Sequence, residues 1–281
     1  MSTGTGTDRS LPHVQSEAHR TGRTVLLTVA LVLMVLCLVP PLSTEARRYE
    51  FVEALQFSLL VVAVPALAAI GAPWRLLGLA SAELPPPNAD GEPSETKVEL
   101  RPVDRLAQGR RRHPEALRSA CFAGIYLAAA ILWRIPPSVN ALARHPWLVA
   151  LEAVCLVPAG IGLWLELVES PPLVPRLSRP HRVALAAIAM WTIWVLAYLV
   201  GLSHASWYHA YAHHAGAGLS LFADQQLTTG TMWVVSACAF IPVVYWNLIR
   251  WLQSEEDPDE EMHRLIRQER IRGRVVEGGS P

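Results

Sequence analysis

The chain has 281 residues, of which 52% are apolar and 17% charged, and its formal net charge is zero. Soluble domains usually carry about 25% charged residues, whereas here whole stretches of about 20 residues carry none, as in transmembrane helices. This composition excludes a soluble enzyme and a secreted domain. A net charge of zero also gives no support to nucleic-acid binding, so we expect no nucleic-acid partner.

Six apolar segments are each long enough to cross the ~30 Å hydrocarbon core of a bilayer. Inside lipid the backbone must satisfy its own hydrogen bonds, so we expect these segments to be helices. The predicted fold class is therefore all-α, a polytopic transmembrane helical bundle. In chain order the expected spans are Thr24–Leu42, Phe51–Pro73, Ala116–Ile135, Pro146–Leu167, Val183–Leu202 and Thr229–Trp251.

Positive charges are distributed unevenly between the two sides of this bundle. Of the 24 Lys and Arg residues, 20 lie on one side: before the first span, in the second and fourth connections, after the sixth span, or, as Arg118 and Arg250, in the adjoining turn of a span. The other side carries only Arg47, Arg48, Arg134 and Arg144. Because cytoplasmic segments are enriched in Lys and Arg, we expect both termini to be cytoplasmic, in a multi-pass protein of a bacterial plasma membrane.

This topology divides the chain into three parts. They are a cytoplasmic N-terminal tail (1–23), a membrane domain (24–251) that includes a cytoplasmic loop (76–113), and a cytoplasmic C-terminal tail (252–281). Within the loop, Leu84–Glu99 is rich in Pro and Glu and is predicted to be a disordered linker. The charged segment Glu255–Arg274 is predicted to be solvated, with a surface helix as the alternative.

Polar side chains gather near the outer ends of three spans. Ionisable groups at membrane depth are costly and indicate function by default. One interpretation is structural, with interhelical hydrogen bonds and caps, such as Asp224 capping the sixth helix. The other is a site for a cation or for the polar surface of a partner. The candidate residues are Glu53, Gln56, Glu152, Asp224, Gln225 and Gln226. At the inner end of the fourth span, Glu166 and Glu169 are expected to be interfacial.

Histidines and cysteines give a second group of candidates. No His lies deep in a span, so we expect no haem, and the four Cys lie apart in apolar stretches as packing residues. The last outer loop is rich in His, and His209 and His213 would share one face of a helix and one metal. The alternative is an interfacial belt of His and aromatic side chains. The candidate metal ligands are His204, His209, His213 and His214.

Three segments resemble the CtaG-type cytochrome c oxidase assembly factors. The stretch Phe222–Trp233, with Asp224-Gln225-Gln226, resembles the Asp-Gln-Gln signature that opens the last span of that family. The second span resembles it through Gln56, Pro65 and Gly71-Ala72-Pro73. The fourth span resembles it through His145-Pro146, Leu151-Glu152, Leu163-Trp164 and Ser170-Pro171. The resemblance covers roughly Arg48 to Glu255, and the first span fits loosely.

The resemblance implies a role in building haem–copper oxidases, with copper insertion into the catalytic subunit as the expected step. Members commonly carry two His in the second span and two beside the Glu of the fourth. The matching positions here are Glu53, Phe57, Val149 and Ala153. Two alternatives follow for copper, which prefers imidazole, thiolate and thioether ligands. Either the loop histidines hold the metal, or this member keeps the scaffold without the ion.

The predicted function is a membrane-embedded assembly factor for a haem–copper cytochrome c oxidase. Its expected partners are the lipid bilayer and a nascent oxidase subunit, and it assists copper insertion or subunit maturation without being an enzyme. Two alternatives remain. One is a small-cation transporter that uses the same carboxylates, and the other is a metal-free structural subunit of a respiratory complex.

Overall fold

A computed structural model describes residues 11–79, 101–105, 107, 115–175, 177–203, 207–212 and 219–255. In this part of the chain, six helical segments are long and apolar enough to cross a membrane, as the sequence predicts. The helices that form them are α1 (Leu11–Leu38), α3 (Glu50–Ser58) with η1 (Leu59–Ala63) and α4 (Val64–Gly71), α7 (Glu115–Arg134), α9 (Leu148–Leu167), α10 (Arg179–Gly201) and α12 (Leu221–Glu255).

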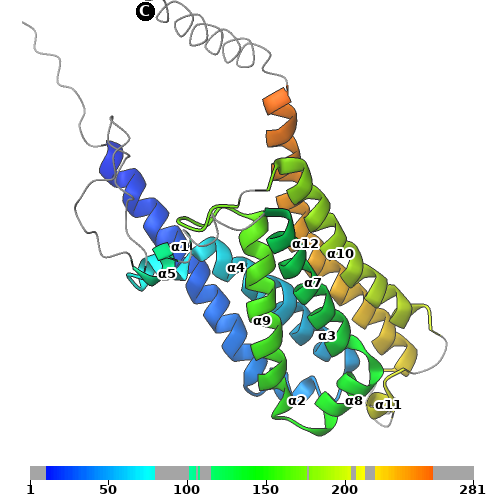
Figure 1. The fold of residues 1–281 in the computed structure, drawn as a ribbon. Coiled ribbons are helices and arrows are strands. Elements are labelled where there is room, and N and C mark those ends of the chain that lie inside the picture. Colours follow the sequence, from blue (N-terminus) through cyan, green and yellow to red (C-terminus); the bar gives the residue numbers. More distant parts are fainter. Residues whose placement is uncertain are drawn as a thin grey trace, which may run out of the picture.

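Short helices connect the spans. Three of them, α2 (Leu42–Glu45), α8 (Pro136–Arg144) and α11 (His209–Ala212), lie together at one end of the bundle, which we call the pocket end (Figure 1). The helix α5 (Pro73–Leu76) lies toward the opposite end, where α1 begins and α12 ends (Figure 1). The first span thus begins, and the last span ends, on the same side of the bundle, as an even number of spans requires. The cytoplasmic location of that side remains a prediction.

The second span is central and is interrupted by a π-helix. Pro65 has no backbone N–H to donate, so an uninterrupted α-helical ladder is impossible there. The five residues of η1 take π-helical geometry just before this proline. Most side chains of this span are buried, including Phe57 and Leu60, and α12, α1 and α9 pack around it. Residues on its first turns therefore face other helices rather than lipid.

The backbones of α9 and α4 approach each other closely. A Cβ added to Gly160 of α9 would lie 2.5 Å from the ring of Pro65 in α4. Glycine at this position lets the two helices meet without a clash. On the far side, α10 lies along α12, and Trp194 and Trp233 stack with their rings 4.7 Å apart.

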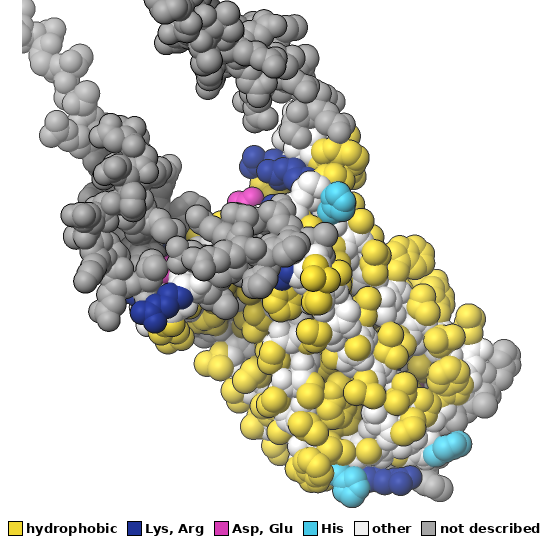
Figure 2. Space-filling view, in the orientation of Figure 1, with side chains coloured by type: hydrophobic (Ala, Val, Ile, Leu, Met, Phe, Trp, Pro, Cys, Tyr) yellow, Lys and Arg dark blue, Asp and Glu magenta, His cyan; other side chains and the backbone are white. Residues whose placement is uncertain are grey.

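The surface matches that of a membrane protein. On the face in Figure 2, hydrophobic side chains cover the middle, and charged and His side chains gather toward the two ends. Large apolar side chains such as Leu31, Val154 and Trp191 are about half exposed or more. In a bilayer these side chains would contact acyl chains.

The structure corrects two of the sequence-based expectations. The sixth span begins at Leu221 rather than Thr229, so the Asp-Gln-Gln element lies within the helix. Glu166 is not interfacial but fully buried, and its two carboxylate oxygens accept hydrogen bonds of 3.0 Å from the guanidinium of Arg118. The predicted linker Leu84–Glu99 and the tail beyond Glu255 lie outside the described residues.

Candidate functional site

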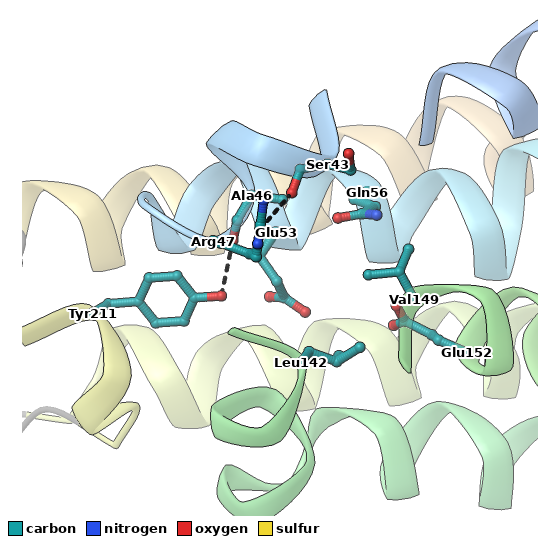
Figure 3. Close-up of a pocket in the computed structure, with 9 residues that line it drawn as sticks. All are labelled: Ser43, Ala46, Arg47, Glu53, Gln56, Leu142, Val149, Glu152 and Tyr211. Atoms are coloured by element: carbon teal, nitrogen blue, oxygen red, sulfur yellow. Dashed lines mark hydrogen bonds between the residues drawn. The ribbon is translucent and has the colours of Figure 1, made fainter. Parts of the chain in front are cut away.

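A small cavity lies at the pocket end between the starts of α3 and α9 and the short helices. It is about 10 Å³ in volume, close to the smallest space that holds one water molecule. Its lining residues are Ser43, Ala46, Arg47, Glu53, Gln56, Leu142, Val149, Glu152 and Tyr211. Figure 3 shows the side chains of Glu53, Gln56 and Glu152 turned toward this shared space. Of the predicted convergence of Glu53, Glu152 and Asp224 from three spans, the part that involves the second and fourth spans is present, together with Gln56. Asp224 of the sixth span does not line the cavity.

Glu53 is neutralised by a residue that the sequence analysis counted only among the positive charges on one side of the membrane. Arg134, the last residue of α7, forms a buried ion pair with Glu53, and its residue exposure is only 3%. The guanidinium also lies over the rings of Phe57 and Tyr208, at 5.4 and 5.3 Å from their centres. Arg134 thus belongs to the site and does not mark a solvated outer connection.

Glu152 has no such partner. It is 2% exposed, and its Oε1 atom has no hydrogen-bond partner among the described residues. The charged groups near it include Glu53 and Arg134, whose guanidinium is engaged by Glu53, and Arg47 lines the same cavity. Oε1 of Glu53 is also without a hydrogen-bond partner there. Two of the residues that line the cavity thus each have one buried carboxyl oxygen without a hydrogen-bond donor among the described residues.

Gln56 ties the cavity to the first span. Its amide Nε2 donates a 2.7 Å hydrogen bond to the backbone oxygen of Cys37 at the end of α1. This bond fixes which way the amide points, so its oxygen is the atom left to face the neighbouring polar groups. The side chain is 2% exposed.

Asp224 caps a helix, but not the helix that the sequence analysis expected. Its two carboxylate oxygens accept hydrogen bonds of 2.9 Å from the backbone N–H groups of Glu50 and Phe51, which open α3. The free N–H groups of a helix start make it a favourable place for a negative charge. Asp224 therefore joins α12 to the N-terminus of the second span and does not cap α12.

The two glutamines beside Asp224 differ in environment. Gln225 is 4% exposed, whereas Gln226 is exposed and its amide donates to the backbone oxygen of Gly201 at 3.3 Å. Neither residue is among those that line the cavity. The Asp-Gln-Gln element thus positions helices around the cavity and does not supply its walls.

Sequence reasoning missed Glu50, which is fully buried close to Arg134, Glu53 and Asp224. Three carboxyl groups, those of Glu50, Glu53 and Glu152, therefore lie near one buried guanidinium. The spacing Glu50-x-x-Glu53-x-x-Gln56 was visible in the sequence, and at i, i+3, i+6 it places three polar groups along one helix side. That pattern indicates a buried polar stripe on the second span.

Two tyrosines of the connection between α10 and α12 close the pocket end. The hydroxyl of Tyr208 donates to the backbone oxygen of Arg134 at 3.0 Å, and that of Tyr211 donates to Ala46 at 2.9 Å. Burial raises the pKa of Tyr208 to about 12 and the pKa of Tyr211 well above its usual value. Both hydroxyls therefore keep their protons near neutral pH. A third bond, from Ala210 N–H to Asn140 Oδ1 at 2.9 Å, holds α11 against α8.

The metal candidates are only partly placed. His209 is exposed on α11, whereas His204, His213 and His214 lie outside the described residues. Within the described ranges no group of three or more His, Cys, Asp or Glu side chains could hold a metal ion. The nine described residues that line the cavity include no His, Cys or Met. Their donors are oxygens, which suit hard cations and are poor ligands for Cu(I).

Comparison with known proteins gives one match. The sequence model of the cytochrome c oxidase caa3 assembly factors (Caa3_CtaG) matches residues 7–254. No curated protein and no solved structure matches the chain. The matched region covers all six spans, including the first, which the sequence resemblance fitted only loosely. The chain therefore belongs to the family of cytochrome c oxidase caa3 assembly factors.

Proposed function

We propose that the chain, as a caa3 assembly factor, binds a maturing oxidase subunit in the plasma membrane and assists its maturation as a chaperone. The supporting observation is that buried polar residues at the pocket end are used to hold the bundle together. Glu53 is paired with Arg134, Gln56 bonds to α1 and Asp224 caps α3. These contacts shape one end of a rigid helical scaffold, and no catalytic step is assigned to them.

We place copper insertion, which the sequence resemblance implies, away from the buried cavity. The cavity offers oxygen donors, and a soft ion such as Cu(I) prefers imidazole and sulfur. The outer-loop histidines are the alternative ligands. His209 supports this assignment because it is exposed at the pocket end, next to Tyr208 and Tyr211, which anchor the loop to the bundle.

A deletion strain provides the first test. It should lose most caa3 oxidase activity, and the intact gene should restore it. A tagged chain should co-purify with the immature catalytic subunit but not in equal amounts with the mature oxidase. Normal oxidase activity in the deletion strain would refute the proposed role. Equal recovery with mature oxidase would instead support a structural subunit of the complex.

Copper insertion needs a separate measurement. Replacing His204, His209, His213 and His214 together by Ala should lower the copper content of the purified oxidase and leave the amount of its protein subunits less affected. Added copper should partly restore activity in this variant. An unchanged copper content would remove the loop histidines from the mechanism. Reconstituted liposomes should show no cation flux, and a measurable flux would favour the small-cation transporter.

A further inference from the structure

Charged side chains at the pocket end are sorted by sign between the interior and the surface. Four carboxyl groups of this end are at most 6% exposed, and they belong to Glu50, Glu53, Glu152 and Asp224. The exposed ionisable side chains of the same end are basic or imidazole groups, namely Arg48, Arg144, His145 and His209. Figure 2 shows Arg and His side chains at this end of the molecule. A partner that approaches along the bundle axis therefore meets positive charge.

The sequence gives the same excess for all three connections at this end. Residues 39–49, 135–147 and 202–220 contain three arginines and five histidines, whereas Glu45 is their sole acidic residue. Two of these arginines have negative groups nearby, because Arg47 lines the cavity with Glu53 and Glu152, and Arg48 pairs with Glu45 at 3.4 Å. The third, Arg144, has no ion-pair partner among the described residues. Its positive charge is thus available to a partner.

Arg144 begins a row of four exposed residues that joins α8 to α9. The row, which we call the docking ridge, consists of Arg144, His145, Pro146 and Trp147. Trp147 is 66% exposed. Arginine and tryptophan are enriched among the residues that contribute most to protein–protein binding, where one supplies directed charge and the other a large apolar surface. The docking ridge combines both residue types within one turn of chain.

The surface beside the ridge is held rigidly. The backbone N–H of Ala210 in α11 donates a 2.9 Å hydrogen bond to Oδ1 of Asn140 in α8. Beneath these two short helices lies a small buried cluster made of Val139, Val200, Tyr208 and Tyr211. A surface that is already ordered loses little conformational entropy when a partner binds. The helix that ends in Arg144 is therefore preorganised for docking.

The position of the ridge favours a protein partner over lipid headgroups. The helices α8 and α11 lie across the end of the bundle rather than along its sides (Figure 1). Side chains on their outer surface therefore face away from the hydrocarbon, where an acidic protein surface complements their charge. On the basis of the assembly role proposed above, we propose that the docking ridge binds an acidic segment of the maturing oxidase subunit, with Arg144 and Trp147 as its main contacts.

The experiment uses the full tagged chain in cells that also make the oxidase, and it measures how much immature catalytic subunit is recovered with the tag. Arg144→Glu should lower this recovery at least about fivefold, because the reversed charge repels an acidic segment. Trp147→Ala should lower it by a similar factor, about fivefold. Wild-type recovery should also fall in high salt, which screens exposed charges. Arg250→Glu is the matched control, since Arg250 is exposed near the end of α12 at the opposite end, and it should behave like the wild type.

The possible failures are distinguishable. Full recovery by both Arg144→Glu and Trp147→Ala would overturn the docking ridge and leave the assembly role standing, whereas no recovery by the wild type would refute both. In nanodiscs, a rise in unfolding temperature with phosphatidylglycerol that Arg144→Glu loses, together with unchanged subunit recovery, would assign the ridge to lipid headgroups and overturn the proposal. Should the variants fold poorly, wild-type recovery decides, and recovery that does not change with salt would count against the ridge.

Discussion

Removing the guanidinium of Arg134 should destabilise the protein more than any other single change at the pocket end. Arg134 pairs with Glu53 in a site where both side chains are at most 5% exposed, and Glu50 lies close by. Arg134→Gln leaves these carboxylates buried without a positive partner. Breaking a buried pair from one side typically costs about 3–5 kcal/mol. We expect a loss of unfolding free energy in that range.

The reverse change should cost less. In Glu53→Gln the guanidinium keeps Glu50 as a nearby negative charge, so we expect a loss of about 1–3 kcal/mol. The double variant should lose clearly less than the sum of the two single losses, because neither charge is then left without its partner. This asymmetry follows from the presence of three carboxyl groups near one guanidinium.

The measurement is denaturant unfolding in detergent micelles, followed by tryptophan fluorescence. Arg48→Gln is the control, since its ion pair with Glu45 lies at the surface, with side-chain exposures of 59% and 39%. Exposed pairs contribute about 0–1 kcal/mol. Similar losses for Arg134→Gln and Arg48→Gln would refute the argument that the buried pair is held in a low-dielectric site. Additive losses in the double variant would refute the coupling.

Three further changes test other parts of the bundle by the same unfolding measurement. Asp224→Ala removes both caps on α3 and should cost about 1–2 kcal/mol, whereas Gln226→Ala should stay within about 0.5 kcal/mol; equal losses would contradict the capping role. The new methyl group of Gly160→Ala would clash with Pro65 of α4, so this change should lower the unfolding free energy by about 1–3 kcal/mol. Gly230→Ala has open space around it and should be neutral or slightly stabilising. A larger loss for Gly230→Ala than for Gly160→Ala would contradict the helix contact. Tyr211→Phe should cost about 0.5–1.5 kcal/mol below pH 10. Because the pKa of Tyr211 is raised in the folded state, its contribution to stability is fully present below the unfolded-state pKa and is lost as pH rises through the higher folded-state pKa. The unfolding free energy of Tyr211→Phe should therefore fall less at high pH than that of the wild type. An identical pH profile for the two proteins would contradict the burial of the hydroxyl.

The membrane architecture could be predicted because it depends on local quantities. Apolar length and the distribution of arginine identify six spans without knowledge of any contact. The convergence of Glu53, Gln56 and Glu152 was also predictable. These residues lie one or two turns inside spans that enter from the same side, so they reach a common depth.

The partners of these residues could not be predicted in the same way. Arg134 ends its span, and its position alone fits a solvated loop as well as a buried ion pair. Which it becomes depends on the rotation of α7 about its axis and on the neighbour that it meets. Likewise Asp224 follows a loop, and local sequence favours capping its own helix, whereas the N–H groups that it binds belong to a segment more than 170 residues away.

The π-helix of the second span changes the angular phase of everything that follows it. Five residues per hydrogen-bonded turn instead of four amounts to one extra residue, and one residue corresponds to about 100° around a helix axis. The extra residue thus brings the face that carries Glu53 and Gln56 closer to the face that carries Pro65, and both meet α9, which carries Glu152 and Gly160. A helical wheel drawn continuously through this span would separate these two faces by about 100° more. Shortening η1 by one residue would turn either the polar groups or the proline contact away from its neighbours.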